Sequence, residues 1–226
     1  MENVRSLSAE FVGTFGFVFF SAGAIVTDAA HPGNLGLLGI ALAQATALSI
    51  LVTSLIRVSG AHFNPAVTLG LWMANKIDAK TGGLYIVTQL VGAVAAAFLV
   101  QAIFPHAASQ AVGVGVPQIS GDLDMVGAIV IEAVLTFFLM SAVFGTAVSP
   151  EAPAVGGFGI GLVLVFAVLV GGPLTGAALN PARAFGPALV AGMWTGHAAY
   201  WIGPLLGGAA AALLWDRILL PRATNR

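Results

Sequence analysis

The sequence predicts an all-α membrane protein in which six transmembrane helices surround two re-entrant half-helices and the two halves of the chain form an inverted repeat. Three observations predict this class: an apolar composition, six long apolar runs, and a tripeptide that occurs once in each half. Of the 226 residues, 58% are hydrophobic and 8% are charged, whereas roughly a quarter are charged in an ordinary soluble domain. Lipid is therefore expected to be the main solvent of this chain.

Six apolar runs are long enough to cross a bilayer, whose hydrocarbon core of about 30 Å requires roughly 20 helical residues. They extend approximately over Leu7 to Val26, Leu35 to Ile56, Leu84 to Phe104, Met125 to Ala147, Val155 to Leu174 and Ala198 to Leu219. The first run carries Glu10, is longer than the apolar part of a signal peptide and precedes five further spans, so we expect it to remain in the mature protein. We interpret residues 1–226 as a single transmembrane domain.

Positively charged residues indicate how the spans are oriented. With six spans, one side of the membrane carries all but one of the Lys and Arg residues, namely Arg5, Arg57, Lys76, Lys80, Arg217, Arg222 and Arg226. Cytoplasmic loops are enriched in Lys and Arg, so this side, with both termini, is predicted to face the cytoplasm. The exception is Arg183, which requires another explanation. Short connections between the spans favour the inner membrane of a prokaryotic cell.

Composition and spacing exclude several classes of function. The chain has no cysteine, and its net charge of −1 offers no basic surface to nucleic acid. His31, His106 and His197 are scattered over outer connections, without carboxylate or Cys partners at metal-binding spacing. No Ser/His/Asp set, paired carboxylates or Gly-rich phosphate loop indicates catalysis. We therefore expect no metal, no cofactor, no nucleic-acid partner and no enzymatic activity.

The second half of the chain repeats the first. Each half begins with a similar segment, AEFVGTF around Glu10 and IEAVLTF around Glu132, and continues to a second pair, SGAHFNPAV from Ser59 and TGAALNPAR from Thr175. The halves extend over approximately residues 1–118 and 119–226. Because each half has three spans, the second enters the membrane from the opposite side. The repeat is therefore inverted, which places function where the halves meet, near mid-bilayer.

The strongest single signal is the tripeptide Asn-Pro-Ala, formed by Asn64, Pro65 and Ala66 and again by Asn180, Pro181 and Ala182. Asn is a preferred N-cap and Pro is favoured at the first helical position, so each copy is predicted to start a helix. The apolar run after each Pro lasts about ten residues, or about 15 Å of helix, which is half of the hydrocarbon core. The sequence therefore predicts two half-helices.

Irregular backbone is predicted before each half-helix, because Gly60 and Gly176 interrupt the preceding spans. Such backbone is tolerated at membrane depth only where protein buries it or it lines an aqueous cavity, so a water-filled path is expected. The N-termini of the half-helices would meet near the midplane, where their partial positive charges repel cations. If each Asn oxygen caps its helix, the amide N–H groups are free to bind the oxygen of a central water, which then cannot relay a proton.

The two Asn-Pro-Ala copies, the two Glu-containing segments and the six-span plan resemble the aquaporin, or major intrinsic protein, family over nearly the whole chain. The resemblance implies a homotetramer in a lipid bilayer, with one passive channel per subunit. The channel would pass water and small neutral solutes such as ammonia, glycerol, urea or hydrogen peroxide. In the family, an outer selectivity filter includes the Arg after the second tripeptide, here Arg183, and three positions that fall on Gln44, Val168 and Ala177. His62 resembles a family residue of the cytoplasmic vestibule.

The filter residues differ from those of a strict water channel, which usually has Phe, His and a small polar residue or Cys in place of Gln44, Val168 and Ala177. We therefore expect a wider opening than a single-file water filter. Ala184 and Ala188 stand where glycerol channels of the family usually carry Asp and a second basic residue. This difference argues against a specialised glycerol channel.

Some of these side chains have alternative interpretations. Glu10 and Glu132 are carboxylates inside predicted spans. They could accept hydrogen bonds from the re-entrant backbone, or they could carry the proton of a proton-coupled secondary transporter. Gln44 could form an interhelical hydrogen bond instead of lining the filter. His62 could make a capping hydrogen bond within its own loop.

Overall fold

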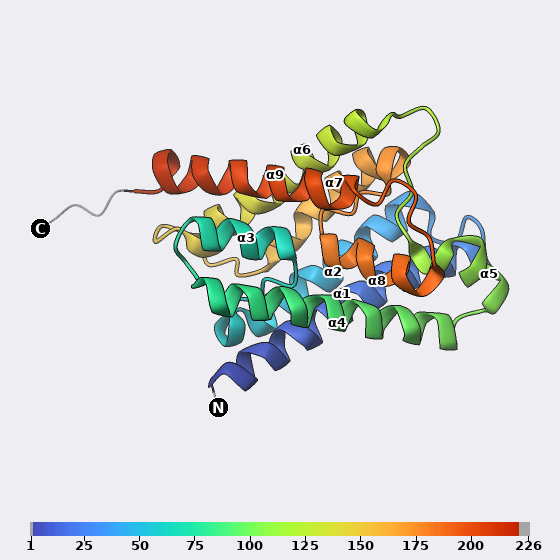
Figure 1. The fold of residues 1–226 in the computed structure, drawn as a ribbon, viewed down its shortest axis with the longest axis horizontal. Coiled ribbons are helices and arrows are strands. Elements are labelled where there is room, and N and C mark those ends of the chain that lie inside the picture. The colour runs from blue at the N-terminus through green and yellow to red at the C-terminus, as the bar shows by residue number, and fades with distance from the viewer. Residues whose placement is uncertain (1, 222–226) are drawn as a thin grey trace, which may run out of the picture.

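The structure, a computed structural model, describes residues 2–221, and its six long helices correspond to the six predicted spans (Figure 1). They are α1 (Glu2–Ala30), α2 (Gly36–Ser59), α4 (Ala79–Ile103), α6 (Met125–Val143), α7 (Phe158–Thr175) and α9 (Ala199–Leu214). α6 and α9 continue into short π-helical turns, η2 (Phe144–Val148) and η3 (Trp215–Leu219). All six are long and apolar enough to cross a membrane. Of the predicted cytoplasmic cations, Arg222 and Arg226 lie outside the described residues.

Shorter helices lie between the long ones. The half-helices are α3 (Pro65–Met73) and α8 (Pro181–Ala191), while α5 (His106–Ala111) and the turn η1 (Gly113–Gly115) belong to the connection between α4 and α6. With 9 and 11 residues, α3 and α8 are too short to cross a bilayer. The start of α1 and the end of α9 lie towards the same end of the molecule, opposite α5 (Figure 1).

The helices of the two halves pack in the same pattern. α1 packs against α2 and α4, and α6 packs correspondingly against α7 and α9. Each half-helix contacts a long helix of the other half, α3 against α9 and α8 against α4, and α2 contacts α7 across the halves. The fold class predicted from the sequence is therefore confirmed, and the half-helices are held between the halves.

Small residues let the long helices pack closely, and many large apolar residues lie on the outer surface. Gly203 and Gly207 of α9 face α6 so closely that a Cβ at Gly207 would overlap the carbonyl of Ala133. The exposed apolar residues of the outer surface include Val12, Ile50, Val91, Val130, Phe166 and Leu206. An apolar exterior around a close-packed interior is the arrangement of an integral, multi-pass membrane protein.

Candidate functional site

Both re-entrant segments adopt the same irregular backbone. α2 and α7 end at Gly60 and Gly176, whose φ angles of 89° and 78° lie in the left-handed region. Further left-handed residues follow in each segment, with φ between 47° and 53°, namely Ala61, Phe63, Ala177 and Leu179. L-residues rarely adopt such angles, which persist only where the surroundings determine them. The repeat therefore extends from the sequence to the backbone angles.

Glu10 of α1 fixes the first re-entrant segment. Its buried carboxylate accepts hydrogen bonds from the backbone N–H groups of His62 and Phe63, at 2.9 and 2.8 Å. The Ser59 hydroxyl and the Gln89 amide also donate to it, at 2.6 and 2.8 Å. Left-handed residues expose consecutive N–H groups to one side of the chain, and the carboxylate satisfies them.

Glu132 of α6 holds the second segment in the same way. Its carboxylate accepts hydrogen bonds from the N–H groups of Ala178 and Leu179, at 2.9 and 2.8 Å, and from the Thr175 hydroxyl at 2.7 Å. Neither Glu132 nor Glu10 lines the cavities described below. Both carboxylates therefore face the re-entrant backbone and not a lumen.

Two tyrosines also bind the re-entrant segments. Tyr85 of α4 donates to the carbonyl of Ser59 at 2.9 Å, and Tyr200 of α9 donates to the carbonyl of Thr175 at 2.8 Å. A signal was available, because the chain has only 2 Tyr residues and each half contains one, some twenty residues after its tripeptide. The hydrogen bonds fix the point at which each span turns into irregular backbone.

The two Asn side chains cap the half-helices as predicted. The Oδ1 atom of Asn64 accepts from the N–H of Ala66 at 2.8 Å. The Oδ1 atom of Asn180 accepts from the N–H of Ala182 at 2.9 Å and, more weakly, from that of Arg183 at 3.3 Å. Pro65 and Pro181 are the first helical residues after these caps. Each Asn oxygen is thus fixed, which orients the amide nitrogen.

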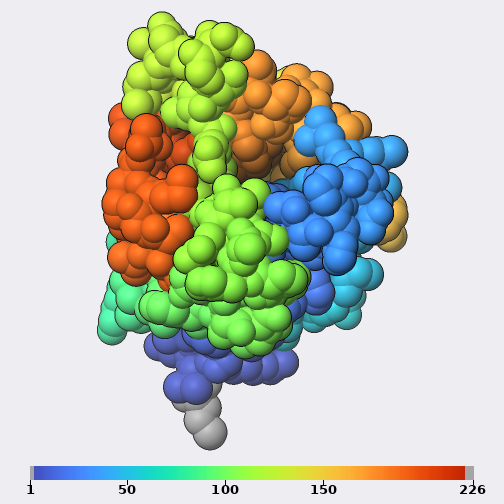
Figure 2. Space-filling view, turned by 90° about the vertical axis from the view of Figure 1, so that its right-hand side faces the viewer, coloured from blue at the N-terminus to red at the C-terminus, as the bar shows by residue number. Residues whose placement is uncertain are grey.

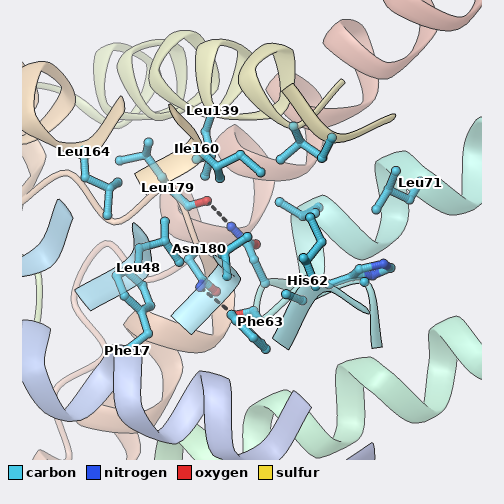
Figure 3. Close-up of a pocket in the computed structure, with 18 of the residues that line it drawn as sticks. Phe17, Leu48, His62, Phe63, Leu71, Leu139, Ile160, Leu164, Leu179 and Asn180 are labelled. Carbon is cyan, nitrogen blue, oxygen red and sulfur yellow. Dashed lines mark hydrogen bonds between the residues drawn. The ribbon is translucent and has the colours of Figure 1, made fainter. Parts of the chain in front are cut away.

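The amide nitrogens bind the opposite half of the molecule. Asn64 Nδ2 donates to the carbonyl of Leu179 at 2.9 Å, and Asn180 Nδ2 donates to the carbonyl of Phe63 at 2.9 Å (Figure 3). We expected both amide N–H groups of each Asn to be free. This expectation was wrong, because one N–H group of each Asn is bonded to the opposite half. An amide has two N–H groups, so each Asn keeps one for another partner. The crossed pair joins the two re-entrant segments to each other.

Both Asn residues line an inner cavity of about 280 Å³. Its walls are mainly apolar, and the large apolar side chains around it include Phe17, Leu48, Leu139, Ile160 and Leu164 (Figure 3). His62 and Lys76 line the same cavity. The cavity therefore extends from the crossed Asn pair towards the end of the molecule that carries the predicted cytoplasmic cations.

His62 lies at the cavity wall, and its side chain contacts a residue of α3 instead of capping its own loop. It lines the inner cavity, and its Nδ1 atom lies 3.1 Å from the Thr68 hydroxyl. Its ring also meets that of Tyr85 edge to face, with 5.1 Å between centroids. These contacts hold the imidazole in one orientation at the cavity wall.

An outer cavity of about 250 Å³ contains two of the four predicted filter residues, Gln44 and Val168. Gln44 is 2% exposed. Ala177 and Arg183 line neither cavity. In the chain, Ala177 stands between Gly176, which lines the outer cavity, and Ala178, which lines the inner one.

Arg183 is buried, with 1% of its surface exposed. Its Nη1 atom donates to the carbonyl of Gly115 at 2.9 Å, whereas Nε and Nη2 are buried without a partner among the described residues. Gly115 was not predicted as part of the site. Within residues 2–221 no three His, Asp or Glu side chains meet as a metal ion would require. The arrangement offers hydrogen-bond donors and a fixed positive charge.

The sequence matches the family described as major intrinsic protein over residues 1–215. It is 42% identical over 225 residues to aquaporin TIP4-4 of Zea mays, an alignment that covers 96% of this chain and 87% of that protein. It is 40% identical to the probable aquaporin TIP3-2 of Arabidopsis thaliana, with 97% and 85% covered.

A solved structure has the same fold. The aquaglyceroporin from Plasmodium falciparum superposes with a TM-score of 0.84, covering 96% of this chain and 97% of that one, at 23% sequence identity. At this identity the likeness concerns the arrangement of the helices alone.

Proposed function

The chain belongs to the major intrinsic protein family, and from this membership we propose that it is a passive transmembrane channel for water and small neutral solutes that excludes ions and protons. The observation that carries the proposal is the crossed Asn pair at the junction of two capped half-helices. It leaves two fixed donors, one from each half, at the wall of an apolar cavity.

Water passage follows from this mixture of apolar walls and a few donors. A water molecule at the Asn pair gives its oxygen to one N–H of Asn64 and one of Asn180. The apolar side chains on the other walls offer no competing hydrogen bonds, so the molecule is not held tightly. Conduction requires binding that is favourable enough to enter and weak enough to leave.

Proton exclusion follows from the same geometry. A water whose oxygen accepts from both Asn side chains points its hydrogens away from the centre along the path, and it cannot accept a proton from its neighbour. The N-termini of α3 and α8 each contribute about half a positive charge. The combined field repels hydronium and metal cations from both directions.

The proposed filter consists of Gln44, Val168, Ala177 and Arg183. Nε and Nη2 of Arg183 are buried without a protein partner among the described residues. In this proposal they donate to the oxygen of a passing molecule, and the charge of the guanidinium repels cations. Gln44 adds an amide at the outer cavity. Val168 and Ala177 are smaller than the residues of a strict water filter, which supports entry of ammonia, urea, glycerol or hydrogen peroxide.

A proton-coupled transporter is the alternative function, and it would require Glu10 or Glu132 to exchange protons with a lumen. Each carboxylate instead accepts at least three hydrogen bonds from its own half. These contacts support a role in holding the loops. If Glu10→Gln and Glu132→Gln proteins fold and retain flux, proton coupling through them is excluded.

We propose further that residues 1–226 form a single channel domain of two inverted halves, approximately 1–118 and 119–226, which assembles as a homotetramer in contact with membrane lipid. The matched helix contacts of the halves and the apolar outer surface support this arrangement. The distribution of Lys and Arg supports cytoplasmic termini. The inner membrane of a prokaryote, which we expected from the short connections, gains no support from the named relatives, which are plant proteins.

The test is stopped-flow light scattering on proteoliposomes that contain the full chain. Shrinkage in an impermeant osmolyte much faster than that of empty liposomes is expected, followed in glycerol and urea by re-swelling. Shrinkage without re-swelling would restrict the function to water. Water flux equal to that of empty liposomes would contradict the proposal.

Gln44→Phe tests the solute range. A large ring on the outer cavity is expected to suppress urea and glycerol flux while water still passes. Val91→Phe, on the exposed face of α4, is the matched control for a change that introduces Phe outside the path. Unchanged urea and glycerol flux in Gln44→Phe would remove Gln44 from the filter.

A further inference from the structure

The turn η1, in the connection between α4 and α6, has an unfavourable backbone. Gly113, Val114 and Gly115 are three consecutive left-handed residues, with φ of 52°, 58° and 79°. A left-handed φ is a genuine outlier for a β-branched residue such as valine. Backbone of this kind persists where its surroundings determine it, often next to a functional group.

Two contacts with α1 determine the turn. The side chain of Val114 is 2% exposed and packs in an apolar cluster whose members are Ala22, Val26, Ala97, Val100 and Ala108. The backbone of Gly115 lies directly on α1, because a Cβ at this position would be 2.8 Å from the Cα of Ala22 and 2.9 Å from its Cβ. The turn therefore has no room to move towards α1.

The other side of the turn faces α8. η1 contacts both α1 and α8, and Figure 2 shows this connection crossing the end of the molecule between the first-half helices in blue and the α8 to α9 region in orange. The carbonyl of Gly115 accepts from Arg183 Nη1 at 2.9 Å. Among the described residues, this carbonyl is the hydrogen-bond partner of the guanidinium, because Nε and Nη2 have no partner there.

We propose that Ala22 and Val114 are positioning residues for Arg183, and that the width of the outer constriction is set by the contact between α1 and η1. Neither residue lines the inner or the outer cavity. The inference rests on the proposed filter role of Arg183. A larger side chain at position 22 pushes the turn towards α8 and carries the guanidinium into the path, whereas a smaller one lets both retract.

The test uses proteoliposomes of the full chain, with water permeability and urea permeability measured per channel. Ala22→Val lowers water permeability by about threefold, a change within the coupling measured between contacting residues, and lowers urea permeability more. Ala22→Gly raises the ratio of urea to water. Ala24→Val is the matched control, since it adds the same atoms to a buried alanine of α1 outside the cluster, and it leaves both permeabilities unchanged.

The Arg183→Ala background separates positioning from a general effect on packing. With the guanidinium removed, Ala22→Val no longer changes water permeability, whereas a defect in folding or in helix packing would persist. If Ala22→Val fails to insert, Ala22→Gly in the two backgrounds provides the same comparison.

Distinct results overturn the two proposals. An effect of Ala22 substitutions that is the same with and without Arg183, or no effect at all, overturns the positioning role. Arg183→Ala with unchanged ion and urea exclusion overturns the filter role itself, and absence of water flux in the native chain overturns the channel.

Discussion

In the first half of the chain Val67 follows the Asn-Pro-Ala tripeptide, and in the second half Arg183 takes the same place. Around this difference the supports are alike. A glutamate, a hydroxyl residue, a tyrosine and a crossed Asn hold each re-entrant segment with matching hydrogen bonds. The repeat therefore supplies the backbone that both half-helices require, and single substitutions within it make the two mouths of the path different.

The inner side of the first half carries polar groups that the second half lacks. Gln89 donates to Glu10 at 2.8 Å and to the Thr68 hydroxyl at 3.0 Å, and Thr68 in turn pairs with His62. Counted from the tripeptide, Ala178 and Ala184 replace His62 and Thr68. The first half thus has a network of polar side chains at the inner cavity. The second half has apolar residues at the matching positions, and its distinctive polar group is the guanidinium of Arg183.

The largest loss of stability and of water flux is expected from removing the glutamate that supports the re-entrant segment in each half. Glu10→Ala and Glu132→Ala each leave two buried backbone N–H groups without an acceptor, and each lost hydrogen bond to a charged group costs about 1.5–3 kcal/mol. Both variants should lose thermal stability in detergent and lose water flux. Glu151→Ala, which removes an exposed carboxylate, is the control. A Glu10→Ala or Glu132→Ala protein with native stability and flux would show that the loops do not depend on these carboxylates.

Arg183→Ala and Val67→Ala form a matched pair that tests where the halves differ. Removing the guanidinium should raise urea flux by about tenfold, the equivalent of about 1.4 kcal/mol, and admit cations. Val67→Ala should leave urea flux and cation exclusion as in the native channel. Isotope uptake into proteoliposomes measures both. Equal effects of the two substitutions would mean that selectivity does not reside in the outer half.

Tyr85→Phe and Tyr200→Phe remove the same hydrogen bond from each half. Each should lower the free energy of unfolding by about 1 kcal/mol, the contribution of a typical hydrogen bond, with a similar shift in both variants. Thermal unfolding monitored by circular dichroism provides the comparison. A loss confined to one variant would show that the two supports are not equivalent.

The smallest effect concerns the starts of α4 and α9, which occupy matching places. Asp78 caps α4, and hydrogen bonds from the hydroxyl and then the backbone N–H of Thr81 hold the pKa of its carboxyl below the ordinary value. α9 starts at Ala199, and its N-cap residue, Ala198, provides no side-chain cap.

Because folding favours the charged form of Asp78, the cap stabilises α4 above the ordinary Asp pKa and is lost as the pH falls through the lowered one. Hydrogen exchange should show protection of the first turn of α4 declining over this range, with no such decline in α9 or in Asp78→Asn. An equal decline at both helix starts would assign the effect to global unfolding.

Local chemistry allowed much of the fold to be predicted. α3 and α8 begin at Pro65 and Pro181 because capping depends on adjacent residues. Helix ends were less accurate. α1 begins at Glu2 and not at Leu7, since a helix can continue beyond the hydrocarbon core that hydropathy detects, and α7 begins only at Phe158, after two glycines.

The contacts that complete the site were beyond prediction because they join distant segments. The crossed Asn bonds link residues 115 and 117 positions apart, and the bond of Arg183 to Gly115 links residues 68 apart. No periodicity or capping rule specifies such pairs. The sequence analysis therefore expected both N–H groups of each Asn to be free, whereas one of them is bonded to the opposite half.

Water and proton permeability measured side by side on the same proteoliposomes test the central claim most directly. If the one free N–H of each Asn orients a central water, water flux should far exceed that of empty liposomes, while the collapse of an imposed pH gradient should be no faster than in empty liposomes. Fast dissipation of the pH gradient together with fast water flux would contradict the proposed orientation of the central water.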